Sequence, residues 1–198
     1  MDYAQRRQAQ ARQTEQAILR TALALMRERD FDQVSVRDIC REAGITTGAF
    51  YHHFPSKEAL LSKGFSPLEQ YMEDALTSHE EEGTSLRLWL ILSAYGRYIE
   101  EECGELSRRY YQRRLTSPKD MAPLDPARSI RQAILECLRQ AMEQGTLPSG
   151  HTPEWLADFC YRHFRGVVID WLLHARGYCL VDKMREDFVF FKSAFLNP

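Results

Sequence analysis

The stretch from Ser35 to His53 constrains the fold of this chain most strongly. Ser35, followed three residues later by Asp38, is a typical helix start. Apolar residues then recur at helical spacing until Gly44, where the left-handed conformation that glycine adopts freely ends the helix. Thr46 is placed to cap a second, short helix that ends near His53. Two short helices joined by a glycine turn predict a helix-turn-helix.

The residues on either side predict further helices. Upstream, apolar residues at helical spacing predict a helix that Thr14 caps and that ends near Asp30, preceded by a loose polar arm over residues 1–13. Downstream, residues 56–198 read as a run of helices without strand signals. We therefore predict an all-α chain in which an N-terminal three-helix domain, residues 1–55, precedes a helical domain, residues 56–198.

The junction between these two parts contains two informative residues. Ser56 is placed to cap the next helix, with Lys57 in its first turn, where a cation opposes the helix dipole. Lys57 is therefore either a solvated lysine or, together with the helix N-terminus, a group that grips a phosphate. Pro67 removes a backbone donor from the same helix, which predicts a kink or a break at Gly64–Pro67, either a hinge or a static bend.

The distribution of charge favours a polyanion contact at one end. The chain has 198 residues, of which 44% are apolar and 27% charged, an ordinary globular composition with a formal net charge of −2. The first 63 residues carry ten Lys and Arg against eight Asp and Glu, which leaves the remainder at −4. A mildly basic head on an acidic body suits a nucleic-acid contact confined to the head.

Several classes of protein are disfavoured by what the sequence lacks. It has neither a signal-peptide core nor an apolar run of about 18 residues, so we expect a cytoplasmic protein that does not contact membranes. The number of cysteines, five, is odd, and no two are spaced as C-x-x-C. We therefore expect the cysteines to be small buried side chains, with a thiol-based switch as the alternative. Nucleophile, zinc and nucleotide motifs are missing, so we predict no catalytic residue, no metal and no cofactor, hence not an enzyme.

The C-terminal helices carry more apolar residues than one packed face requires, which predicts either a homodimer interface or a broader internal core. The candidate interface residues are Trp155, Phe159, Val167, Trp171, Phe188 and Phe191. Aromatic residues at helical spacing are either core or the lining of a small-molecule pocket, for which the candidates are Trp89, Tyr95, Tyr98, Tyr110, Tyr111 and His163. A cluster of Arg108, Arg109, Arg113 and Arg114 either attracts an anionic ligand or is a solvated face.

Residues Thr14–Leu61 resemble the DNA-binding domain of the TetR family of bacterial transcriptional regulators. The resemblance rests on the motifs Phe31-Asp32-x-Val34-Ser35-Val36-x-Asp38-Ile39, Ala43-Gly44-Ile45-Thr46, Gly48-x-x-Tyr51-x-His53-Phe54 and Lys57-Glu58-x-Leu60. It implies a repressor that binds a palindromic double-stranded DNA operator as a homodimer and is released by an unidentified small-molecule effector. The second domain would then bind the ligand and dimerise.

The resemblance also implies which residues meet DNA. By position, the DNA-binding set is Ser35, Arg37, Thr46, Thr47, Gly48, Ala49, Tyr51, His52, His53 and Lys57. Thr46–Ala49 would face the major groove, while Tyr51, His53 and Lys57 would meet phosphates. The short second helix has few long polar side chains, so we expect Arg37, whose fork fits guanine O6 and N7, to supply much of the base discrimination.

Overall fold

The computed structural model describes residues 3–77, 83–116, 126–147 and 150–196, and every regular element in these ranges is a helix. The chain forms two compact units. We call them the head unit, Met1–Phe65 with Glu102–Ala122, and the body unit, Ser66–Glu101 with Pro123–Pro198. Within the described ranges, none of the helices has the length and apolar character required to cross a bilayer.

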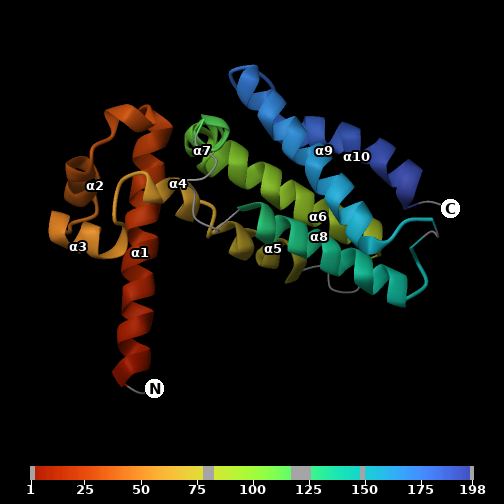
Figure 1. Cartoon of the computed structure of the whole chain (residues 1–198), viewed down its shortest axis with the longest axis horizontal. Helices are drawn as coiled ribbons and strands as arrows, with labels where there is room; N and C mark the ends of the chain where they lie inside the picture. Colours follow the sequence, from red (N-terminus) through yellow and green to blue (C-terminus); the bar gives the residue numbers. More distant parts are fainter. Residues whose placement is uncertain (1–2, 78–82, 117–125, 148–149, 197–198) are drawn as a thin grey trace. The chain divides into compact units, whose positions relative to one another are not determined.

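The head unit is built around the first helix (Figure 1). It contains α1 (Tyr3–Glu28), the 3-10 turn η1 (Phe31–Gln33), α2 (Val36–Glu42), α3 (Thr47–His53), α4 (Ala59–Lys63) and α7 (Gly104–Thr116). α1 packs against α2, α4 and α7, and α2 packs against α3. The core that joins them is apolar and fully enclosed, with Ile18, Ile39, Phe50, Phe54 and Leu60 all at 0% exposure.

The start of α1 differs from the prediction. Residues 3–13 are helical and exposed, and Thr14 lies inside the helix, where its hydroxyl donates to the Gln10 carbonyl at 3.0 Å instead of capping an N-terminus. Ala, Arg and Gln dominate this segment, and they are strong helix formers. With neither Gly nor Pro to stop it, the helix extends toward the N-terminus beyond its packed part.

The break at Pro67 is confirmed. α4 ends at Lys63 and α5 (Leu68–Thr77) begins immediately after Pro67. Ser56 does not cap α4, because α4 begins at Ala59 and its N-cap residue, Glu58, makes no capping hydrogen bond through its side chain. The chain leaves the head unit between Phe65 and Ser66, within this break.

The body unit has α6 (Thr84–Arg97) at its centre (Figure 1). α6 packs against α5, α8 (Pro126–Glu143) and α10 (Leu180–Phe195), and α9 (Pro153–Leu173) packs against α8 and α10. A π-helical segment, η2 (Tyr98–Glu102), follows α6 directly. α9 ends at Leu173, shortly before Ala175 and Arg176, which take the left-handed conformation with φ of 52° and 61°.

Candidate nucleic-acid interface

The N-terminus of α2 is fixed by a capping box. The Asp38 amide donates to the Ser35 hydroxyl at 3.1 Å, and the Ser35 amide donates to the Asp38 carboxylate at 3.0 Å. The Ser35 hydroxyl itself donates to the same carboxylate at 2.6 Å. That bond is the largest cause of the lowered pKa of Asp38. The predicted cap is therefore confirmed, but both donors of Ser35 are used inside the protein and are not free to bind a phosphate.

The turn between α2 and α3 has the geometry that its sequence predicts. Gly44 has a φ of 65°, the left-handed value at which L side chains are strained. The Ile45 amide then donates back to the Cys40 carbonyl at 2.9 Å. Thr46 caps α3 by accepting a hydrogen bond from the Ala49 amide at 3.1 Å. These bonds fix the angle at which α3 leaves α2.

α3 separates an apolar inner face from a small, polar outer face. Phe50 and Phe54 are fully buried and stack with their ring centroids 5.5 Å apart. Tyr51 is 54% exposed, and its ring is nearly perpendicular to that of Phe50, with the centroids 5.4 Å apart. A Cβ at Gly48 would meet only the Thr46 hydroxyl, at 3.8 Å. Since packing does not require a glycine there, the outer face of α3 is open to a closely approaching surface.

Most of the predicted DNA-binding residues lie on exposed surface of α2, the turn and α3. The exposed residues are Arg37, Thr46, Thr47, Gly48, Tyr51 and His52, whereas Ala49 and His53 are half-buried. Arg37 lies in the first turn of α2, two residues after the Ser35 cap. The side chains combine one long cation with short polar groups and an aromatic hydroxyl, which suits contact with base edges and phosphates.

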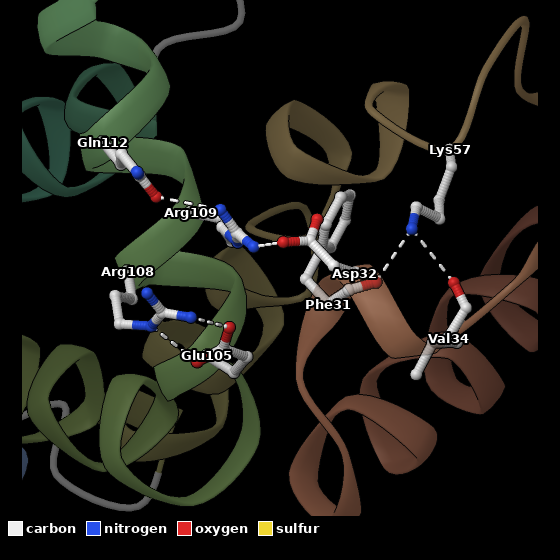
Figure 2. A network of polar contacts seen from close by, with 8 residues as sticks. All are labelled: Phe31, Asp32, Val34, Lys57, Glu105, Arg108, Arg109 and Gln112. Carbon is white, nitrogen blue, oxygen red and sulfur yellow. Dashed lines mark hydrogen bonds and ion pairs between the residues drawn. The ribbon is translucent and has the colours of Figure 1, made fainter.

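Lys57 lies differently from the prediction (Figure 2). Its ammonium points at the connector between α1 and α2, where it donates to the carbonyls of Phe31 at 2.8 Å and Val34 at 3.0 Å. It also lies 4.3 Å from the centre of the Phe31 ring. Burial lowers the pKa of this half-buried group. Lys57 therefore fastens α4 to η1, and a phosphate contact would compete with these bonds.

α7 holds the same connector from another direction (Figure 2). Arg109 forms an ion pair with Asp32 and donates to the Gln112 side chain at 3.0 Å. The neighbouring Arg108 makes two bonds to the carboxylate of Glu105, one turn earlier in α7, at 2.8 and 2.6 Å. Two members of the predicted arginine cluster are thus neutralised by acidic groups of the head unit. Sequence reasoning missed the Arg109–Asp32 pair because no local pattern connects residues so far apart in the chain.

The residues predicted to line a ligand pocket are divided between the two units. Tyr95 and Tyr98 are buried in the core of the body unit, and the ring centroids of Tyr98 and Tyr71 lie 5.0 Å apart. Tyr110 and Tyr111 belong to α7 in the head unit, and His163 is exposed on α9, 3.0 Å from Asp187. Of the six, Trp89 alone lines a described cavity of the body unit. Tyr95, Tyr98 and Tyr110 are buried core positions, which the alternative interpretation had allowed.

The predicted dimer residues divide into two groups. Val167, Trp171, Phe188 and Phe191 are buried within the body unit, so the broader internal core accounts for these four. Trp155 is 41% exposed and Phe159 is half-buried, with their rings stacked at 5.3 Å. Sequence reasoning missed two strongly exposed apolar residues on the same helix pair, Leu173 at 79% and Phe190 at 76%.

Comparison with known proteins identifies the head. Residues 18–63 match the family described as "Bacterial regulatory proteins, tetR family". Over 185 residues, the chain is 25% identical to the HTH-type transcriptional repressor BepR of Brucella suis biovar 1 (strain 1330), covering 89% of this chain and 88% of that protein.

Solved structures share the fold over nearly the whole chain. The Thermus thermophilus repressor FadR, in complex with lauroyl-CoA, superposes with a TM-score of 0.68 at 20% identity, covering 89% of this chain and 92% of that one. A transcriptional regulator from Saccharomonospora viridis, in complex with choline, also gives 0.68 at 20% identity, covering 94% and 99%. Residues 18–63 therefore form a helix-turn-helix domain of the TetR family of bacterial regulatory proteins, and over most of its length the chain is similar to transcriptional regulators of that family.

Proposed function

We propose that the protein is a repressor that binds a palindromic operator as a homodimer and leaves it when a small-molecule effector binds the body unit. The observation that carries the proposal is the outer face of α3, where short polar side chains surround a glycine that packing does not require. Repression follows the name of the similar Brucella protein. Operator binding also implies a cytoplasmic location.

On DNA, we assign the major-groove contact to Thr46, Thr47, Gly48 and Ala49, and base discrimination chiefly to Arg37. Tyr51, His52 and His53 meet the sugar-phosphate edge. Ser35 and Lys57 act indirectly, because their donors hold the α2 cap and the α1–α2 connector in place. Contacts to phosphates position a protein on the duplex, whereas contacts to base edges specify sequence.

A homodimer is supported by a stripe on α9 that stays exposed or half-buried in the protomer. Residues of this stripe recur every three or four positions, which places them on one helix face, and none is buried: Trp155, Phe159, Arg162, Gly166, Ile169 and Leu173. No atom lies within 4 Å of a Cβ built at Gly166, so another helix can approach there closely. We expect Gly166→Arg to shift the protein from dimer to monomer in analytical ultracentrifugation while leaving its helical content, measured by circular dichroism, unchanged.

An effector is supported by the ligands in the two structural relatives, an acyl-CoA and choline. Their different chemistry leaves the effector of this protein open. To release a homodimer from its operator, the ligand has to bind more tightly to a state in which the two heads do not fit successive half-sites. Ligand binding then shifts the population toward that state and away from DNA.

The test is fluorescence anisotropy with a labelled duplex from the region upstream of the protein's own coding sequence. We expect saturable binding that weakens steeply with salt, because phosphate contacts release counterions. Arg37→Ala should reduce the preference for one base pair in each half-site, whereas its matched control, Arg41→Ala on the same helix, should lower affinity evenly across sequences. Equal affinity of the wild-type protein for the upstream duplex and an unrelated one would contradict the proposal.

A further inference from the structure

A cavity of about 860 Å³ opens in the body unit between the start of α6, the turn after α8 and the second half of α10. Its volume lies within the range of roughly 300–1,000 Å³ that is typical of small-molecule sites. The polar wall comes from backbone and side chains around Thr84 and from Gln144 and Thr146. The apolar wall comes from Leu86, Trp89, Phe188, Val189 and Leu196.

The apolar wall is unusually open for a protein interior. Val189 is 61% exposed although it lines the cavity, and Leu86 is exposed beside it. Trp89 and Phe188 are in contact, with ring centroids 5.5 Å apart and the planes tilted by 39°. A ligand with an apolar body would remove these surfaces from water, which stabilises the complex in proportion to the area covered.

The charge at the cavity has one sign. Arg185 and Lys192 both line it from α10, seven residues and therefore about two turns apart on one side of the helix. No Asp or Glu is found among the lining residues that the structure describes. The Arg185 guanidinium lies 5.5 Å from the centre of the Trp89 ring, and its contact with the Asp182 carboxylate is long, at 3.5 Å. Two cations beside an apolar wall favour an anionic group on an apolar molecule.

We propose that this cavity is the effector site and that the effector is a small organic anion, a carboxylate or an equivalent acid group attached to an apolar body. The acid group pairs with Arg185 and Lys192, and the apolar body lies along Trp89, Phe188 and Val189. This assignment rests on the proposed function, a repressor released by a ligand, and it specifies the chemistry of that ligand and the site where it binds.

The test uses two dyes that differ in one charged group. These are 1-anilinonaphthalene-8-sulfonate, an aromatic anion, and N-phenyl-1-naphthylamine, its uncharged analogue; both fluoresce more strongly in apolar sites. They are titrated into the full-length wild-type protein and three variants. Arg185→Gln with Lys192→Gln removes the charge at the cavity. Arg176→Gln with Lys183→Gln removes the same charge from exposed positions of the body unit that do not line it. Val189→Trp fills the cavity from an exposed position and so spares the core.

We expect the wild-type protein to bind the anionic dye more tightly than the uncharged one. The cavity double variant should weaken the anionic dye about tenfold or more, the loss of at least one charge-assisted contact, while the control double variant changes it less than about threefold. Val189→Trp should weaken both dyes. Equal loss in the two double variants would overturn the assignment, and so would dye binding that Val189→Trp leaves unchanged, as expected for dye on the exposed α9 stripe.

Duplex binding by the same proteins separates the two proposals. If the Val189→Trp variant no longer binds the dyes but still binds the upstream duplex, the result supports a ligand site in the cavity that is distinct from the DNA contact. A wild-type protein that binds the duplex but neither dye refutes the cavity alone. Dye binding at the cavity without any sequence-specific duplex binding refutes the repressor function and leaves the anion site standing.

Discussion

Replacing Lys57 by Met tests whether this residue holds the head unit together or binds DNA. Its ammonium donates to the carbonyls of Phe31 and Val34 at 2.8 and 3.0 Å and lies 4.3 Å from the Phe31 ring centre. Met keeps most of the aliphatic stem but has no donor. The substitution therefore leaves the Val34 carbonyl without this bond and releases η1 from α4.

The expected cost follows from these contacts. A hydrogen bond from a charged donor contributes about 1.5–3 kcal/mol, and a cation over an aromatic ring adds about 0.5–1 kcal/mol at an exposed site. Because Lys57 is half-buried and water can replace part of what is lost, we discount the sum to about 2–3 kcal/mol of unfolding free energy. For a chain of this length, that corresponds to a fall in melting temperature of about 5–10 °C.

The assay pairs thermal unfolding, followed by circular dichroism, with duplex binding at several salt concentrations. Lys63→Met is the matched control: Lys63 forms a partly exposed ion pair with Glu15 at 2.6 Å, a kind of contact that contributes only about 0–1 kcal/mol. We expect Lys57→Met to lower the melting temperature and keep the salt slope of binding. A slope reduced by about 0.9, the share of one phosphate contact, with an unchanged melting temperature would refute the reasoning.

Two further predictions concern the helix caps and the glycines of the head unit. Asp38→Asn should make the free energy of unfolding depend less on pH in the acid range. The Ser35 hydroxyl is the main cause of the lowered pKa of Asp38 in the folded protein. The stabilisation in the wild-type protein is therefore complete above the ordinary pKa of 3.8 and is lost as pH falls through the pKa of the folded state. Urea unfolding at pH values from about 7 down to about 3 measures this, and equal slopes in both proteins would contradict it. Gly44→Ala should cost about 1 kcal/mol from its φ of 65° alone, since no atom lies within 4 Å of the new Cβ. Gly64→Ala should cost more, about 1–3 kcal/mol, because its Cβ would overlap Leu106 and approach the Leu60 carbonyl to 2.9 Å; unfolding curves that rank the two glycines in the opposite order would show the packing argument to be wrong.

The helix-turn-helix was predictable because its determinants are local. The Ser35 cap, the left-handed Gly44 and the Thr46 cap each depend on residues within four positions of one another, so each is visible in the sequence and confirmed in the structure. The break at Pro67 has the same origin, since proline lacks the donor that a continuous helix requires. Short-range hydrogen bonding thus fixes both the start of α3 and the place where the chain leaves the head unit.

The contacts of long side chains were not predictable. A lysine beside a predicted helix N-terminus suggests a phosphate, but Lys57 finds two carbonyls 26 and 23 residues away that only the packed head brings near. The aromatic residues are ambiguous from sequence alone, because a buried core and a pocket wall share the same spacing. The anionic-ligand cavity is defined instead by Arg185 and Lys192, which fall on the outer side of α10.

The described chain passes between the two units at two places, and the helix is interrupted at both. The presence of Pro67 therefore does not by itself distinguish a hinge from a static bend. At the first, between Phe65 and Ser66, the helix is interrupted before α5 begins. At the second, between Glu101 and Glu102, the π-helical segment η2 replaces the regular spacing of α6, although it contains neither Gly nor Pro. Neither α4 nor α7 is therefore one continuous α-helix with its neighbour in the body unit. The proline is therefore one of two helix interruptions that the described chain has between the units, and only the proline announces itself in the sequence.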